Sequence, residues 1–182
     1  MMLMRSHYAR DFAQTLGTEM TNQPLLGALR DAQSQGEHKA LVPYITESLN
    51  AFLEKKGVIH SPEDILLDWE GNVERPLGTQ AYGYPLLGAR TYPDAAVLRP
   101  FTCAFEFDRE GGPAKFKERF MKAAVHVLSG AYDACLLVYM LKSGSTAQYT
   151  EDGETHSSRL LANLEAHGLF VTFIPAAERI PG

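Results

Sequence analysis

The sequence has few cysteines and no long apolar stretch, and both shortages exclude whole classes of protein. Cys103 and Cys135 are its only two cysteines. Both lie in apolar, strand-like segments, which predicts reduced core thiols of a cytoplasmic protein. The longest unbroken apolar run, residues 134–141, is far too short to cross a bilayer. The Met-rich start lacks the apolar stretch and the cleavage site of a signal peptide, so we expect no membrane partner.

Positive charge is also scarce. The chain has 17 basic and 22 acidic residues, a net charge of -5, whereas a typical nucleic-acid-binding domain is basic. Any contact with nucleic acid must therefore depend on a local basic patch. The six histidines show no metal-ligand spacing, so a zinc finger is not expected.

What the sequence does have is an ordinary globular composition. Hydrophobic residues make up 45% of the 182 residues and charged residues 21%, which excludes disorder as the dominant state. This length suits one domain over residues 1–182, with a core at about 36–175. Residues 1–20 are expected to be a loose N-terminal arm or a short helix. Residues 72–92 are rich in Gly, Pro and Tyr and predict a peripheral loop or a small hairpin.

Hydrophobic periodicity places the regular elements. Leucine and aromatic spacing predicts helix within 22–56, and residues 65–69 are strand-like. A strand at 94–98, broken at Arg99-Pro100, predicts a hairpin with the strand that follows. Strands and helices then alternate, at residues 102–108, 113–128, 134–141, 157–167 and 169–174. Such alternation predicts an α/β fold with a central, partly parallel sheet and helices on its faces.

The hairpin gathers acidic side chains. Glu106 and Asp108 share one face of their strand, and antiparallel pairing around Pro100 places Asp94 roughly opposite Glu106. Three carboxylates on one face of a buried sheet repel one another, and a divalent cation is the simplest compensation. Hard cations such as Mg²⁺ prefer carboxylate oxygens. The alternative is a polar strand face that is merely solvated.

The next helix carries a basic stripe beside its apolar face. Its members, at helical spacing, are Lys115, Arg119, Lys122 and His126. Beside a metal-binding cluster, this stripe predicts a cradle for phosphate groups. The alternative is a solvated charged face, which the i,i+4 pair Glu118–Lys122 favours.

Together these residues resemble a known family. The run Tyr92-Pro93-Asp94, then Glu106-Phe107-Asp108 and a helix with basic residues, is similar to the PD-(D/E)XK nuclease superfamily. This is the restriction endonuclease-like fold, shared with archaeal Holliday-junction resolvases and many repair and phage nucleases. The resemblance covers about residues 36–175, and the element order carries more weight than the short motif. It implies a central mixed sheet flanked by helices.

The resemblance also implies roles for residues. Asp94 and Glu106 match the family's ligands for Mg²⁺ or Mn²⁺, and the carbonyl of Phe107 matches a backbone group that helps to hold the metal. Asp108 stands where the family has a lysine that orients the attacking water. An aspartate supplies no positive charge there, so this departure puts the catalytic set in question.

Three explanations of Asp108 remain open. Some restriction endonucleases carry a second carboxylate at this place, which can bind a second metal or act as a base. In other members the lysine has moved to a neighbouring element; here Lys115 is preferred over Arg119 and Lys122, because it lies near the helix start. The third explanation is a loss of catalysis.

A few further residues have weaker signals. Glu47 or Glu37 can match the glutamate that many members carry on the leading helix, with a plain surface glutamate as the alternative. Tyr82 and Tyr84 can stack on bases. Lys142, after the buried strand, can touch phosphate. Ordinary packing or an ordinary loop is the alternative for these three.

The sequence therefore predicts a divalent-metal-dependent nuclease that hydrolyses DNA phosphodiester bonds in restriction or repair. Its catalytic group is Asp94, Glu106, Asp108 and Lys115, and its contacts to DNA are Arg119, Lys122, His126 and Lys142. Small members of this fold often act as homodimers. The alternative is a catalytically inactive member that binds nucleic acid or another protein. A more distant alternative is a small-molecule α/β enzyme whose carboxylates bind metal.

Overall fold

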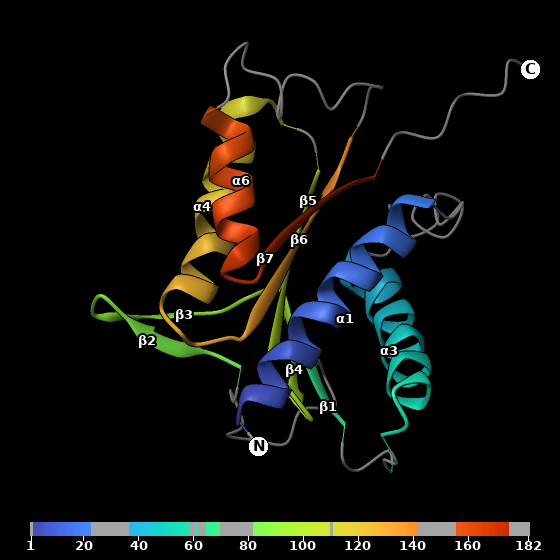
Figure 1. Cartoon of the computed structure of the whole chain (residues 1–182). Helices are drawn as coiled ribbons and strands as arrows, with labels where there is room; N and C mark the ends of the chain where they lie inside the picture. Colours follow the sequence, from blue (N-terminus) through green and yellow to red (C-terminus); the bar gives the residue numbers. More distant parts are fainter. Residues whose placement is uncertain are drawn as a thin grey trace, which may run out of the picture.

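A five-stranded mixed sheet, in the order β1-β4-β5-β6-β7, forms the centre of the molecule and has helices on both faces (Figure 1). The computed structural model describes residues 2–22, 37–58, 61, 65–69, 82–109, 111–141 and 156–174. The strands of the sheet are β1 (Leu66–Trp69), β4 (Ala95–Arg99), β5 (Cys103–Arg109), β6 (Ala134–Met140) and β7 (Leu169–Ile174). The helices are α1 (Met2–Asn22), α3 (Glu37–Lys55), α4 (Pro113–Leu128) and α6 (His156–Ala166). The predicted α/β class and the central mixed sheet are confirmed.

The pairing of the strands changes direction at β5. β1, β4 and β5 pair antiparallel, whereas β5, β6 and β7 pair parallel. The parallel strands are joined through α4 and α6, as crossover connections require. In the β4–β5 ladder, Ala95 pairs with Phe105 and Val97 with Cys103. The same register, continued by one residue, places Asp94 opposite Glu106.

The N-terminal segment corrects the expectation of a loose arm for residues 1–20. It forms the 21-residue helix α1, whose Phe12, Leu16 and Met20 are fully buried. Gly17 lets α1 approach the sheet closely, because a Cβ atom there would lie 2.7 Å from Thr172 Oγ1. The Thr172 hydroxyl donates a hydrogen bond to the Gly17 carbonyl at 2.9 Å. This helix is therefore an integral part of the core.

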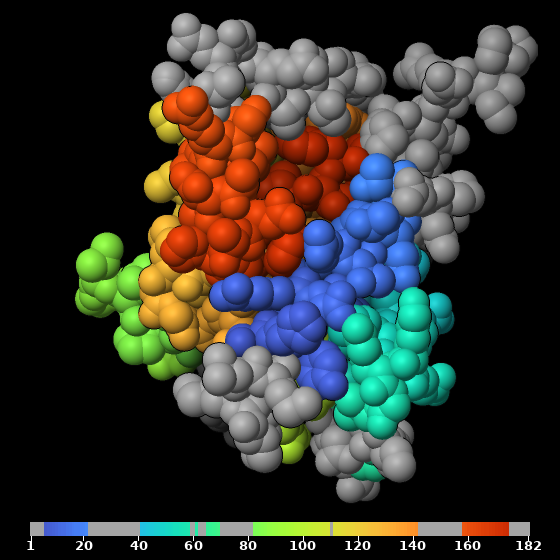
Figure 2. All heavy atoms as spheres, viewed as in Figure 1, coloured from blue at the N-terminus to red at the C-terminus, as the bar shows by residue number. Residues whose placement is uncertain are grey.

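Both faces of the sheet bury apolar side chains, but they differ in the charge that they bury. α1 and α3 cover one face, where the buried side chains of the described residues are apolar apart from Thr172. α4 covers the other face together with α6, and the buried charged residues Asp94, Glu106, Asp108 and His126 lie on this side. Figure 2 shows α1 at the surface between α6 and α3. The charged residues thus have a single face of the sheet in common.

A small second sheet accounts for part of the segment predicted as a loop or hairpin. β2 (Tyr84–Leu86) and β3 (Ala89–Thr91) pair antiparallel and project beside α4 (Figure 1). Their two-residue turn has positive φ at both positions, 46° at Leu87 and 84° at Gly88, which is the geometry that tight hairpins favour. Residues 72–81 lie outside the described part. None of the helices described here is long and apolar enough to cross a membrane.

Candidate active site

Asp94 and Glu106 form a buried pair of carboxylates on adjacent strands. Asp94 directly precedes β4, and its backbone N–H donates to the Phe105 carbonyl at 3.0 Å. Its carboxylate turns back toward β5, where Oδ2 accepts a hydrogen bond from the Phe107 N–H at 2.8 Å. Asp94 is 8% exposed and Glu106 is 0% exposed. The hairpin therefore brings together two of the three carboxylates that the sequence predicts as metal ligands, Asp94 and Glu106 but not Asp108.

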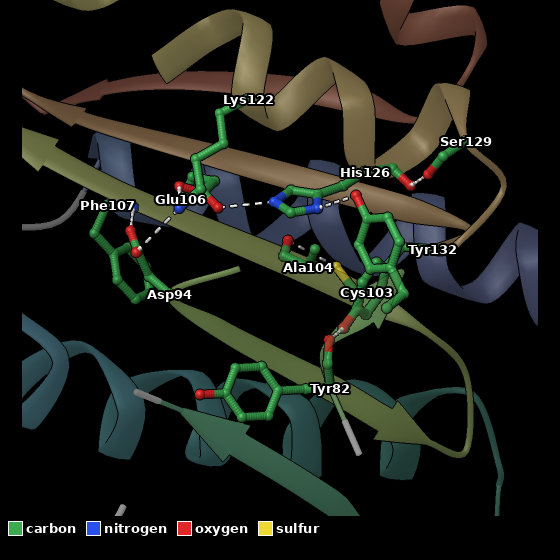
Figure 3. A network of polar contacts seen from close by, with 11 residues as sticks. Tyr82, Asp94, Cys103, Ala104, Glu106, Phe107, Lys122, His126, Ser129 and Tyr132 are labelled. Carbon is green, nitrogen blue, oxygen red and sulfur yellow. Dashed lines mark hydrogen bonds and ion pairs between the residues drawn. The ribbon is translucent and has the colours of Figure 1, made fainter. Parts of the chain in front are cut away.

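Lys122 of α4 supplies the positive charge for this pair. Its Nζ lies 2.9 Å from Glu106 Oε2 and 3.6 Å from Asp94 Oδ1. Figure 3 shows Lys122 above the two carboxylates. Among the buried side-chain nitrogen and oxygen atoms of the described residues, Glu106 Oε2 alone has no hydrogen bond apart from this ion pair, which is therefore its compensation. Burial works against the charged form of Lys122, but the carboxylates of Glu106 and Asp94 outweigh that penalty and raise its pKa above the ordinary value.

His126 holds the other oxygen of Glu106. Its Nε2 lies 2.8 Å from Glu106 Oε1, and its Nδ1 lies 2.8 Å from the hydroxyl of Tyr84. The imidazole is 0% exposed. The prediction that His126 contacts nucleic acid is therefore wrong, because the ring is enclosed between β5 and the hairpin. It belongs to the support of Glu106 instead.

Asp108 stands apart from this pair and has its own cations. Lys115 Nζ lies 2.7 Å from Asp108 Oδ1, and Arg119 Nε donates to Oδ2 at 2.8 Å. Within the described part of the chain, no three His, Cys, Asp or Glu side chains are grouped so that they could hold a metal. The expected cluster of three carboxylates is thus a pair, Asp94 and Glu106, with Asp108 neutralised separately.

The structure also places a different lysine at the carboxylate pair from the one that the sequence favours. The sequence favours Lys115 as the replacement for the lysine missing at position 108, because Lys115 lies near the start of the helix. In the structure Lys115 binds Asp108, and Lys122 reaches Asp94 and Glu106. The physical reason is the path of α4 across the sheet: the turn that carries Lys122 lies above the carboxylate pair.

The pair fits a hard divalent cation in its chemistry. Mg²⁺ commonly binds one or two carboxylates and completes its shell with water and substrate phosphate. Asp94 Oδ1 and Glu106 Oε2 face the same ammonium group, and Oε2 has no competing hydrogen bond. Two carboxylate oxygens are therefore turned toward one positive charge, which is the arrangement that a shared metal needs.

The remaining residues that the sequence singles out differ in their exposure, and some lie outside the described part of the chain. Glu47 is exposed on α3, in agreement with a plain surface glutamate. Tyr82 is buried, and Tyr84 is half-buried against His126, so both take part in packing. Lys142 lies outside the described residues, as does the side chain of Glu37.

The sequence does not predict the part that two residues take in this face. It suggests only base stacking for Tyr84, and the bond to His126 has no local signal because the two residues are 42 positions apart. Asp68 of β1 is a further buried carboxylate. It pairs with Ala96 of β4 and therefore shares the face of Asp94. The sequence indicates only that Asp68 lies in a short strand-like segment, which does not reveal its burial.

A separate groove lies between α1, α6 and β7. Its lining includes Thr18, Leu161 and Phe170, and none of the predicted site residues contributes to it. The buried carboxylates and this groove are therefore independent features of the molecule.

Comparisons with protein-family models, with curated proteins and with solved structures find no match to this chain. The assignment of a function therefore depends on the site itself and on the resemblance of its motif.

Proposed function

We propose that this chain is a divalent-metal-dependent nuclease with a restriction endonuclease-like core, and that its substrate is DNA. The observation that carries the proposal is the buried pair Asp94 and Glu106, on adjacent strands, facing one cation from α4. The order of the elements supports it: an antiparallel β1-β4-β5 unit is followed by α4 and by parallel β6. This is the arrangement that the motif implies.

Asp94 Oδ1 and Glu106 Oε2 are the oxygens that would hold the metal, and the resemblance adds the carbonyl of Phe107. A bound Mg²⁺ or Mn²⁺ lowers the pKa of its water and offsets charge on the scissile phosphate. Hydrolysis then forms one bond from water oxygen to phosphorus and breaks one P–O bond, leaving a phosphate monoester and a hydroxyl.

Lys122 would take the part of the lysine that is missing at position 108. Its ammonium group lies at the two carboxylates, where a metal would displace it, and the displaced group would stand beside the phosphate. A positive charge there stabilises negative charge that develops during hydrolysis. Asp108 has no such charge to offer, which makes Lys122 the better candidate than any residue of the motif itself.

Lys115 and Arg119 are the candidates for contact with the DNA backbone. Both side chains are partly exposed on α4, at 42% and 32%. Asp108 holds their charged ends together at one place on the helix. This gives the acidic chain a local basic patch next to the carboxylate pair, as phosphate contact requires.

Cleavage of a supercoiled plasmid with Mg²⁺ or Mn²⁺ tests the proposal. We expect wild type to nick or linearise the plasmid and Asp94→Asn to leave it intact. The matched control is Asp133→Asn, because Asp133 Oδ2 accepts a hydrogen bond from Thr102 away from the site. This control should keep the activity. Wild-type protein that cleaves no more than Asp94→Asn would refute the proposal.

One observation favours a second candidate, a catalytically inactive member of the same fold that binds nucleic acid. The protein's own cations already compensate each of the three carboxylates, through Lys115, Arg119 and Lys122. Such a protein would retard labelled DNA in a salt-dependent way, and a chelator would not change the binding. Metal-dependent cleavage of the same DNA would exclude this candidate.

A further inference from the structure

A tyrosine and a histidine stand behind Glu106, away from the metal-facing oxygen. The Tyr84 hydroxyl lies 2.8 Å from His126 Nδ1, and His126 Nε2 lies 2.8 Å from Glu106 Oε1. A carboxylate only accepts hydrogen bonds, so Nε2 must carry the proton. In a neutral imidazole Nδ1 then accepts, and the Tyr84 hydroxyl donates. Burial raises the pKa of Tyr84, which keeps this hydroxyl protonated.

The surroundings of His126 hold the ring in place. The rings of Tyr84 and Tyr132 pack edge-on against the imidazole, with centroids 5.7 Å and 5.8 Å away. His126 and Glu106 are both fully buried. The hydrogen bond between them is therefore protected from water, and rotation of the ring would break contacts on two sides.

We propose that Tyr84 and His126 are positioning residues for the metal site, a role that rests on the proposed function. By occupying Glu106 Oε1, the pair leaves Oε2 as the oxygen that faces the cation shared with Asp94. Partners of this kind fix the orientation of a metal ligand and raise its affinity for the metal. Tyr84 comes from β2 and His126 from α4, so the pair also connects the small hairpin to Glu106 on β5.

Titration of Mn²⁺ by calorimetry tests the proposal, with Tyr84→Phe as the variant. It removes one hydroxyl and keeps the ring. We expect Mn²⁺ affinity to fall by about tenfold, the lower end of the effect of losing such a partner. Tyr132→Phe is the matched control. It also loses a hydroxyl, but that hydroxyl donates to the Tyr82 carbonyl and is not part of the hydrogen-bond chain to Glu106. Tyr132→Phe should bind Mn²⁺ as wild type does.

Two substitutions of His126 separate positioning from packing. His126→Gln keeps an N–H donor for Glu106, so it should retain more Mn²⁺ affinity than His126→Leu, which has none. We expect the leucine variant to lose roughly 10- to 100-fold in affinity. Equal affinities for the two variants, with matched thermal unfolding, would contradict the positioning role.

A spectroscopic measurement gives a readout that does not need metal. The ¹⁵N shifts of the His126 ring should show a protonated Nε2 and a bare, hydrogen-bonded Nδ1. In Tyr84→Phe the Nδ1 shift should move toward that of a free acceptor. A proton on Nδ1 in the wild-type neutral ring would overturn the proposal.

The outcomes distinguish this proposal from the proposed function. If wild type and Tyr132→Phe bind Mn²⁺ and Tyr84→Phe binds it equally well, the positioning role fails and the metal site stands. If wild type binds no Mn²⁺, with or without a DNA duplex, the metal site fails and the role of the pair fails with it.

Discussion

The two faces of the central sheet share the same strands and both bury apolar side chains, but among the described residues the buried charges lie on one face alone. Along β5, Phe105 and Phe107 point to the face covered by α1 and α3, whereas Glu106 and Asp108 point to α4. On the first face aromatic rings pack together, with Phe12 5.5 Å from Phe101 between ring centroids. On the second face carboxylates meet lysine, arginine and histidine.

This difference indicates that the apolar side chains stabilise the fold, whereas the buried charges have another role. Buried ion pairs contribute little net stability, because removing charges from water costs about as much as their attraction returns. An apolar core stabilises without that cost. The apolar clusters on both faces therefore account for the stability of the fold, and the charged residues of the second face need another reason to be there. The metal site and the phosphate contacts proposed above would supply that reason.

The largest expected effect comes from breaking the apolar face. Phe12→Ala removes a fully buried ring from α1 and should cost about 3–5 kcal/mol in the free energy of unfolding. Urea denaturation measures this loss. Gln14→Ala, exposed on the same helix, is the control and should stay within about 0.5 kcal/mol of wild type. Equal losses in both variants would contradict the burial of α1.

An intermediate effect is expected from the charged face. Lys122→Met leaves Glu106 Oε2 without its cation, and in EDTA this should lower the free energy of unfolding by about 2–3 kcal/mol. The expected loss is smaller than that for a fully buried ion pair, because the lysine is partly exposed. Mn²⁺ should then raise the unfolding temperature of this variant more than that of wild type, since the metal no longer competes with an ammonium group.

Lys117→Met is the control for that comparison, because Lys117 is exposed on the same helix. It should unfold as wild type does, with and without Mn²⁺. An equal gain from Mn²⁺ in wild type and in Lys122→Met would show that Lys122 does not stand at the cation position.

The smallest expected effect lies at the rim of the charged face. Lys115→Ala breaks the ion pair with Asp108, but this lysine is 42% exposed, so the unfolding free energy should change by less than about 1 kcal/mol. Binding of a DNA duplex should instead lose about one unit of salt dependence. Filter binding over a range of salt measures it. An unchanged slope would remove Lys115 from the DNA contact.

Local patterns were sufficient for much of this arrangement. The alternation of side chains along a strand and antiparallel pairing are properties of neighbouring residues, and they predicted Asp94 opposite Glu106. The helical stripe from Lys115 to His126 also follows from spacing. What spacing does not give is the position of α4 over the sheet. Lys122 rather than Lys115 reaches the carboxylate pair for that reason.

Two further features depend on contacts between distant parts of the chain. The buried stripe of α1 contains Ala9 and Ala13, whose small side chains give little hydrophobic signal. For this reason the sequence does not predict that α1 is buried. His126 belongs to the same stripe as three exposed or half-exposed cations. Its burial depends on Tyr84 of the hairpin, and no local rule brings these two residues together.

The most direct test of the metal site is a calorimetric titration of Mn²⁺ into wild type and Glu106→Gln, with Glu47→Gln, exposed on α3, as control. Wild type and the control should bind Mn²⁺ with equal affinity, and Glu106→Gln should not bind it. Binding that survives in Glu106→Gln, or no binding by wild type with a DNA duplex present, would contradict a metal site at Asp94 and Glu106.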